Sequence, residues 1–333
     1  MGGAYSGLSG EKREIAGIGS ALVDLLLFED EAFLQQVSDI KGGMTLVEGD
    51  FADGVLAKTS KEVAVVPGGA ACNTIVGVGM LGGEATFVGK RGNDELGDFF
   101  ETDLKKNNVV PKLVGSETST GRVLSIVTPD AQRSMFTYLG AASELSPLEV
   151  TPELFKNAAV VLVEGYLLFN TDLMMATLKA AKAAGACIAM DLASFTVVEA
   201  SLDFIRQEVI SYVDILIANE DEAKAFTGLE DEEASLAEMA KVADVAVLKQ
   251  GGRGSLVSCE GVVTKIEPVS GDDIVDTTGA GDLWAAGFLY GMVQGLDMKA
   301  CGNIASACGY EVCRVIGADI PAEGWDRIRS TFE

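Results

Sequence analysis

The second half of the chain alternates short apolar runs with amphipathic segments. Four apolar runs have strand length: AVVLVEG (159–165), ACIAMDL (186–192), DILIANE (214–220) and VAVLKQGG (245–252). Three segments between them have helical spacing: 171–185, 198–210 and 220–226. We expect Thr171 to cap the first helix and Gly185 to end it. This alternation predicts βαβ units and a mainly parallel, doubly wound α/β sheet with helices on both faces.

The polar residues that end these four strands are candidates for a functional site. Ligands of doubly wound sheets bind at the carboxyl ends of the strands. The candidates are Glu164, Asp191, Asn219 and Lys249.

The first half has shorter strand-like segments separated by turn signals. They cover residues 22–29, 44–48, 61–69, 120–128 and 133–140, and the last two predict a hairpin. We expect a small β-sheet lid, with strands from about 22–66 and 119–139, that excludes water from a reactive centre. Without repeats or linkers, the chain predicts one domain over 13–333 after a flexible tail of residues 1–12.

Composition narrows the class of protein. The chain has 333 residues, 48% of them hydrophobic, and a formal net charge of −25. That charge argues against nucleic acid and anionic membranes as partners. The six cysteines form no C-x-x-C pair, and the start MGGAYSGLSG has no apolar core. We therefore expect a soluble cytoplasmic protein, and we interpret the myristoylation-like start MGGAYS as part of the tail.

The absence of histidine limits the chemistry. The sequence contains no His, which excludes Ser-His-Asp and Cys-His nucleophiles, His-ligated zinc and imidazole proton transfer. Acid–base catalysis must use Asp, Glu, Lys, Tyr or Cys.

Two glycine-rich segments resemble nucleotide-binding motifs. GVGMLG (77–82) fits G-x-G-x-x-G but stands late in a helix-like run, so close helix packing is favoured over an NAD site. GGEATFVGKR (82–91) departs from the P-loop spacing, and its ATFVG predicts a strand.

The stretch DTTGAGDLWAAGFLYGM (276–292) combines an anion site with a carboxylate. Gly279, Ala280 and Gly281 place backbone N–H groups at a predicted helix start, and Thr277 and Thr278 add hydroxyl groups. Asp282 could simply complement the helix dipole, worth ~0.3–1 kcal/mol. Alternatively, the amides hold a transferring phosphoryl group while Asp282 acts as the base.

This stretch resembles the C-terminal signature of the PfkB (ribokinase-like) family of small-molecule kinases. Residues 66–100 resemble the family's N-terminal signature, NEDE (219–222) its N-x-x-E element, and LKQGGRG (248–254) its nucleotide loop. The resemblance runs from about residue 15 to residue 317. It implies a ribokinase-like fold and an ATP-dependent kinase.

The resemblance implies roles on the nucleotide side. Asp282 matches the catalytic base, and Gly279, Ala280 and Gly281 match the anion hole. Asn219 and Glu222 match the element that organises Mg²⁺ through water, although NEDE could also be a helix cap. The matches on the ATP side are Asn219, Lys249, Gly251, Gly252, Gly254, Thr277 and, bordering the adenine, Asn303.

The resemblance also implies an acceptor side. Asp24 matches the acid that binds sugar hydroxyls, while Gly68, Gly69 and Asn73 match the acceptor loop, or form a plain strand-to-helix turn. Arg133 in the hairpin could move over the phosphates or be an ordinary surface arginine.

The acceptor itself is left open by these residues. Several segments resemble the bacterial adenosine-kinase-like branch of the family, but Ser20 and Ala70 depart from its commoner patterns. We expect adenosine O5′, with a sugar such as fructose or ribose as the alternative. Phe136 or Tyr138 could stack on a purine or pack on the core. A non-catalytic ligand sensor, an oxidoreductase and a homodimer formed through lid strands are further hypotheses.

Overall fold

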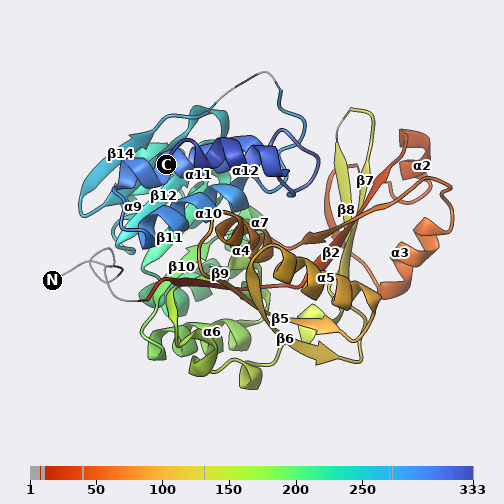
Figure 1. The fold of residues 1–333 in the computed structure, drawn as a ribbon, viewed down its shortest axis with the longest axis horizontal. Coiled ribbons are helices and arrows are strands. Elements are labelled where there is room, and N and C mark those ends of the chain that lie inside the picture. The colour runs from red at the N-terminus through yellow and green to blue at the C-terminus, as the bar shows by residue number, and fades with distance from the viewer. Residues whose placement is uncertain are drawn as a thin grey trace.

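A computed structural model describes residues 8, 12–39, 41–130, 132–269, 271 and 273–332. Within this part of the chain, the strands form a nine-stranded and a five-stranded sheet, which lie side by side (Figure 1). The large sheet has the order β14-β13-β12-β11-β10-β9-β1-β5-β6. Its strands are β1 (Glu14–Ile18), β5 (Ala85–Gly92), β6 (Val109–Ser116), β9 (Ala158–Glu164), β10 (Cys187–Asp191), β11 (Ile215–Asn219), β12 (Val245–Lys249), β13 (Ser255–Cys259) and β14 (Val262–Ile266).

The large sheet is parallel from β6 to β12, and β13 and β14 join it as antiparallel neighbours. Strand β1 pairs with both β5 and β9, so the chain builds the sheet outward in both directions from β1. This reversal of strand order is where doubly wound sheets bind their ligands, at the carboxyl ends of the strands.

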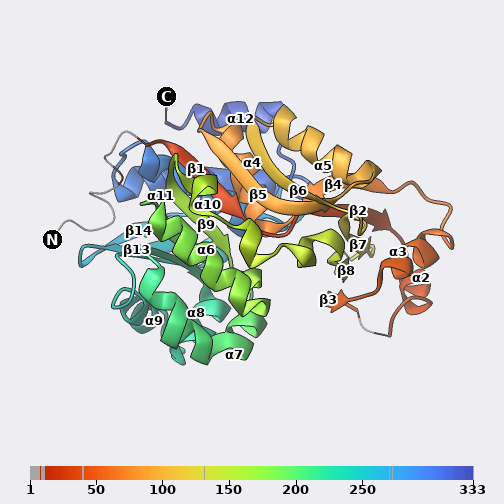
Figure 2. The same cartoon turned by 90° about the horizontal axis from the view of Figure 1, so that it is seen from below.

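Helices cover both faces of the large sheet (Figure 2). Neighbouring strand residues alternate between two hydrophobic clusters: Ile15 belongs to one and Ala16 to the other. The first cluster includes residues of α4 (Ala70–Met80), α5 (Glu95–Lys106), α10 (Ala280–Val293), α11 (Met298–Val312) and α12 (Ala322–Arg329). The second includes residues of α6 (Thr171–Ala183), α7 (Phe195–Phe204), α8 (Glu220–Thr227) and α9 (Glu232–Met239). The doubly wound prediction is confirmed.

The small sheet has the order β3-β8-β7-β2-β4. Its strands are β2 (Leu22–Phe28), β3 (Gly43–Leu46), β4 (Ala64–Gly68), β7 (Gly121–Val127) and β8 (Arg133–Tyr138). Strands β7 and β8 form the predicted hairpin. On β2, Val23, Leu25 and Leu27 pack in a cluster with residues of α2 (Glu31–Gln35) and α3 (Gly49–Leu56), so Asp24 belongs to the opposite face.

Local predictions are confirmed with small shifts. The run 77–82 lies largely in α4 and the run 85–89 in β5, as a helix and a strand rather than nucleotide loops. Asn170, not Thr171, caps α6, because its side chain accepts a hydrogen bond from the Leu173 amide. In the predicted tail, Leu8 is buried in the first cluster; residues 1–7 and 9–11 lie outside the described residues. No helix of the described chain is long and apolar enough to cross a bilayer.

Candidate active site

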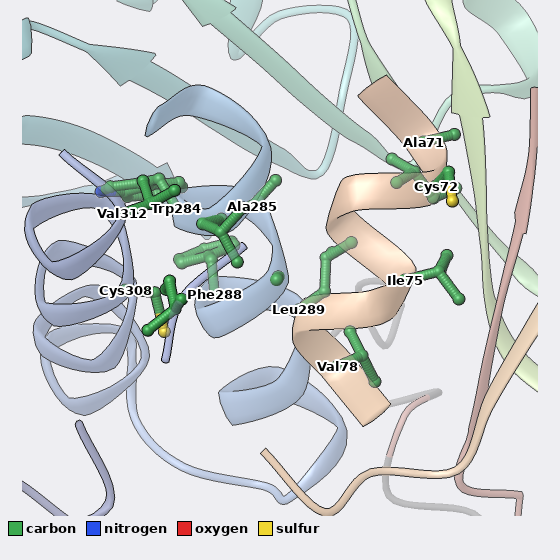
Figure 3. Packing of buried hydrophobic residues seen from close by; sticks show 14 of the residues in the cluster. Ala71, Cys72, Ile75, Val78, Trp284, Ala285, Phe288, Leu289, Cys308 and Val312 are labelled. Carbon is green, nitrogen blue, oxygen red and sulfur yellow. The ribbon is translucent and has the colours of Figure 1, made fainter. Parts of the chain in front are cut away.

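Close packing of two helices brings distant residues together. Helix α10 lies between α4 and α11 (Figure 3). A Cβ on Gly77 of α4 would lie 2.6 Å from the Cβ of Ala286 on α10, so glycine permits the contact. The packing places Asn73 beside Asp282, 209 residues apart, and the Asn73 amide donates to Asp282 Oδ2 at 2.9 Å.

The turn before α10 has the geometry of an anion site. Gly279 caps the helix with a φ of +74°, and a Cβ there would lie 2.9 Å from Ala318. The Ala280 amide donates to Thr277 and the Leu283 amide to Gly279. Among the described residues, the amides of Gly281 and Asp282 therefore stay available to an anion.

Asp282 is a buried carboxyl near several other acids. Burial raises its pKa to about 6, and the Asp191 carboxylate acts in the same direction. The hydrogen bond from Asn73 and the charge of Lys249 oppose this shift. A buried carboxylate with a pKa slightly below neutrality is ionised at neutral pH yet basic enough to accept a proton.

The residues expected on the acceptor side lie around Asp24. A Cβ on Gly68 would lie 2.5 Å from Asp24 Oδ1, and a Cβ on Gly69 would lie 2.4 Å from the Ser20 carbonyl oxygen. Gly69 has a φ of +97° and begins α4, whose first turn carries Asn73. Burial raises the pKa of Asp24 to about 7, although the Arg133 charge lowers it.

Arg133 reaches from β8 of the small sheet to the turn before α10. Its guanidinium donates to Asp276 Oδ2 at 3.1 Å, to the Thr278 hydroxyl and to the Ser125 hydroxyl at 3.2 Å. Its side chain is 11% exposed. Arg133 is therefore a largely buried link between the small sheet and the turn before α10 rather than a free surface arginine.

Lys249 lies against the same turn from the end of β12. Its ammonium would lie 3.1 Å from a Cβ on Gly281 and pairs with Asp191 at 2.8 Å. Burial lowers the pKa of Lys249, but the Asp191 and Glu222 carboxylates outweigh burial and leave it above its usual value. The ammonium thus stays charged where a phosphoryl group would lie.

The glycines after Lys249 form a short turn, Gly251–Arg253. Added Cβ atoms at Gly251 and Gly252 would meet open space, whereas one at Gly254 would lie 2.1 Å from the Ile266 carbonyl. Open backbone at Gly251 and Gly252 fits a nucleotide, and Gly254 has a packing role. Thr277 is exposed beside the catalytic turn, and Asn303 is exposed on α11 next to Gly302, which packs on Ile266.

Asn219 and Glu222 form a capping box at the start of α8. The Asn219 side chain accepts from the Glu222 amide at 2.9 Å, and Glu222 accepts from the Asn219 backbone and side chain, both at 2.8 Å. The described residues contain no cluster of three or more metal-binding side chains. These oxygen donors suit Mg²⁺, which keeps waters and substrate phosphates as its other ligands.

The aromatic residues expected to stack on a purine do not face this site. Phe136 packs against Phe51 of α3, with ring centroids 5.0 Å apart, and Tyr138 lies against Gly49. Both belong to the α3-side face of the small sheet, whereas Arg133 is on the other face. The alternative, packing on the core, is therefore confirmed.

Other residues of the site had weaker signals in the sequence. Glu164 and Asp191 end buried strands, but no motif gave them a role. Asp276 accepts from the Thr278 amide and hydroxyl and from the Gly317 amide, and these bonds fix the turn before α10. Tyr166 follows β9, and its pKa rises to about 12 through burial and the nearby Glu164 and Asp282 carboxylates. What these residues share in the sequence is their position, either at or just after the end of a strand or just before α10.

Comparison with known proteins identifies the family of this chain. The model of the pfkB family carbohydrate kinases matches residues 44–324. The chain belongs to this family. Adenosine kinase from Dictyostelium discoideum is 30% identical over 326 residues, which cover 91% of this chain and 95% of the relative.

Two solved bacterial structures share the whole fold. The crystal structure of adenosine kinase from Sinorhizobium meliloti has a TM-score of 0.86 and 32% identity, covering 96% of this chain and 99% of that chain. A probable sugar kinase from Rhizobium etli has a TM-score of 0.87 and 28% identity, covering 96% and 98%. The fold is therefore ribokinase-like, and the chain is an ATP-dependent phosphotransferase acting on an alcohol group of a nucleoside or sugar.

Proposed function

We propose that this protein transfers the γ-phosphoryl group of ATP to the 5′-hydroxyl of adenosine. The observation that carries the chemistry is the Asn73–Asp282 hydrogen bond, which fixes a buried carboxylate beside the open amides of the α10 turn. Base and anion site on one helical turn meet the two needs of phosphoryl transfer, deprotonation and charge stabilisation.

The remaining residues have matching roles. Asp24 binds acceptor hydroxyls, while the backbone at Gly68 and Gly69 lets the acceptor approach closely. Asp282 orients and deprotonates the hydroxyl. The Gly281 and Asp282 amides, Lys249 and Arg133 stabilise the charge on the phosphoryl group, as cationic groups do in such sites. The small sheet acts as a lid that excludes water.

Asn219 and Glu222 would hold Mg²⁺ through water, and their donor chemistry fits a hard cation. The bound ion would supply charge neutralisation of the ATP phosphates. Gly251, Gly252, Thr277 and Asn303 would border ATP.

Adenosine is favoured over a sugar by two observations. Two of the compared relatives are named adenosine kinases. Tyr166, after β9, lies near the Glu164 and Asp282 carboxylates, and Phe195, which begins α7 after β10, is 46% exposed. Such rings suit a purine base, which fructose and ribose lack. A sugar remains the second candidate because the Rhizobium etli relative is named a probable sugar kinase.

The assembly and location are part of the same proposal. Strand β3 is an exposed edge of the small sheet, with Met44 and Leu46 open to solvent. An unpaired strand edge with apolar side chains suits pairing with the same strand of a second copy. We therefore propose a homodimer formed through the small sheet, and we propose that the protein is cytoplasmic.

The test is an ADP-release assay with ATP·Mg²⁺ and adenosine, inosine, ribose or fructose as acceptor. Asp282→Asn serves as the matched blank, because the amide keeps the size and loses the base. We expect turnover with adenosine and a loss of 10²–10⁴-fold in the variant, with ATP binding retained.

The outcomes separate the candidates. Turnover only with a sugar would replace the acceptor and keep the mechanism. Near-wild-type turnover in Asp282→Asn would contradict Asp282 as the base. ATP and adenosine that both raise the melting temperature without turnover would favour the ligand sensor.

A further inference from the structure

A small cavity borders Asp282 at the carboxyl edge of the large sheet. Its volume is about 10 Å³, and the polar side chains that line it are Thr74, Glu164, Asp191 and Asp282. A cavity of this size is close to the minimum that holds one water molecule, and these four side chains are the polar partners that such a water would have. Glu164 and Asp282 therefore face a common space large enough for a single bridging water.

The first turn of α4 fixes both carboxyl groups. The Ala71 amide donates to Glu164 Oε2 at 3.0 Å, and two residues later the Asn73 side chain donates to Asp282 Oδ2 at 2.9 Å. Gly19 leaves room for Glu164, since a Cβ there would lie 2.3 Å from its Oε2. Both acids are thus hydrogen-bonded to the first turn of α4, and both line the cavity.

Charges from several elements act on Asp282. The titratable groups around it are Asp24 on β2, Cys72 on α4, Glu164 at the end of β9, Tyr166 after β9, Asp191 on β10, Glu222 on α8 and Lys249 on β12. Buried carboxyl groups outnumber the nearby cations, Lys249 and Arg133. Since unpaired buried charge is costly, these carboxyls cannot all be ionised near neutral pH.

Glu164 is the member of this set without a cation. Asp191 pairs with Lys249 at 2.8 Å, and the Arg133 charge acts on Asp24. The groups that donate to Glu164 are the Ala71 amide and Ser20, which are neutral. Burial raises the pKa of Glu164 to about 7, so this carboxyl gains and loses a proton near neutrality.

We propose that Glu164 relays protons for Asp282 through one water molecule in this cavity. The inference rests on the proposed kinase activity. As the new O–P bond forms, Asp282 accepts the hydroxyl proton. The cavity water then accepts this proton from Asp282 and gives one of its own to Glu164, which leaves the water unchanged and Asp282 ionised. Glu164 releases the proton to solvent after the product leaves. Glu164 is thus a positioning residue that acts through Asp282.

The first test needs no turnover. An infrared titration of the substrate-free protein follows the carbonyl stretching band of buried protonated carboxyls. We expect a wild-type band that is lost with a midpoint near pH 7. Glu164→Gln should lack the share of the band that Glu164 contributes and keep the share of Asp24 and Glu222, whose pKa burial also raises to about 7. A band of equal intensity in the two proteins would overturn the proposal. Glutamine keeps the Ala71 hydrogen bond through its amide oxygen, and a thermal melt checks its fold. A wild type without such a band would overturn the proposal.

The second test is the pH dependence of kcat. We expect the wild-type rate to rise in two steps, as Asp282 and then Glu164 ionise, and Glu164→Gln to keep only the first. The variant should match the wild type near pH 6, where Glu164 is neutral in both, and be about tenfold slower at pH 8. A purely structural role would lower the rate equally at every pH and would overturn the relay.

A matched control is Asp103→Asn. Burial raises the pKa of this carboxyl too, and Asn107 donates to it at 2.7 Å, but it lies on α5 outside the cavity. The control should keep both steps; loss of the second step there as well would count against Glu164. Absence of wild-type turnover would overturn the proposed kinase activity and the relay together, whereas an unchanged pH profile in an active Glu164→Gln would overturn only the relay.

Discussion

At the scale of single residues, Asp24 is the acceptor-side group whose charge state matters most. Its carboxyl is buried against Gly68, and burial raises its pKa to about 7. Only the ionised form offers both oxygens as hydrogen-bond acceptors to a pair of hydroxyls. Acceptor binding should therefore strengthen as the pH rises through about 7.

We expect Asp24→Asn to raise the KM for the acceptor about 10–100-fold, because charge-assisted hydrogen bonds are worth about 1.5–3 kcal/mol. The KM for ATP should change little, and the pH dependence of acceptor binding should disappear. Steady-state kinetics with each substrate varied in turn measure this.

A suitable control is Asp53→Asn. Asp53 pairs with Arg122 on the opposite face of the small sheet and should leave both KM values unchanged. Equal effects of Asp24→Asn on both substrates would remove Asp24 from the acceptor site.

At the scale of elements, the turn before α10 is bound to the small sheet and to the segment after α11. Asp276 receives hydrogen bonds from Thr278, Gly317 and Arg133, so one carboxylate fixes the catalytic turn, the segment after α11 and a strand of the small sheet. These bonds and the Arg133 charge outweigh burial and lower the pKa of Asp276. The position of the small sheet and the shape of the turn before α10 are thereby linked.

We expect Asp276→Asn to reduce kcat about tenfold or more and to cost about 1–3 kcal/mol of stability, because an amide has only one acceptor oxygen and leaves a buried donor unpaired. The KM for ATP and the acceptor should change less than kcat. Thermal unfolding and steady-state kinetics measure these effects.

Asp273→Asn tests whether the effect is specific to the turn. Asp273 accepts hydrogen bonds from Tyr310 on α11 and from Arg314 just after it, and it makes no described contact with the turn. A variant of Asp276 with wild-type kcat would show that the turn holds its shape without this carboxylate.

At the scale of the whole molecule, the buried acids make stability depend on pH. Glu164 has a folded-state pKa of about 7, above its ordinary value of 4.5. Such a group favours the folded state below its unfolded-state pKa, and this contribution is lost as the pH rises through about 7.

We expect the free energy of unfolding to fall between about pH 5 and pH 8 less steeply in Glu164→Gln than in the wild type. The rise in the pKa of Glu164 from 4.5 to about 7 sets an upper limit of about 3 kcal/mol on this difference in unfolding free energy, at 1.36 kcal/mol per pKa unit. Denaturant unfolding at several pH values measures the difference. Parallel curves for the two proteins would show that Glu164 does not titrate in this range.

The sequence by itself determined the elements and the glycine-rich turn at the start of α10. Alternation of apolar runs with helical segments predicts the parallel sheet, and glycines with an acid at a helix start predict the anion site at Gly279–Asp282. These features depend on residues close in the chain. For the same reason the candidates after the strands, from Glu164 to Lys249, could be placed at one edge of the sheet.

Only the tertiary structure decided which side chains meet. The alternation along β8 places Arg133 and Phe136 on opposite faces of the strand. It does not tell which face points toward the site, because a two-residue period distinguishes two faces without saying what each one packs against. The contact of Asn73 with Asp282, which are 209 residues apart, depends on the packing of α4 against α10. The proton-holding role of Glu164 depends on which acids share a cavity and which have a cation, and burial and charge pairing are set by the whole fold.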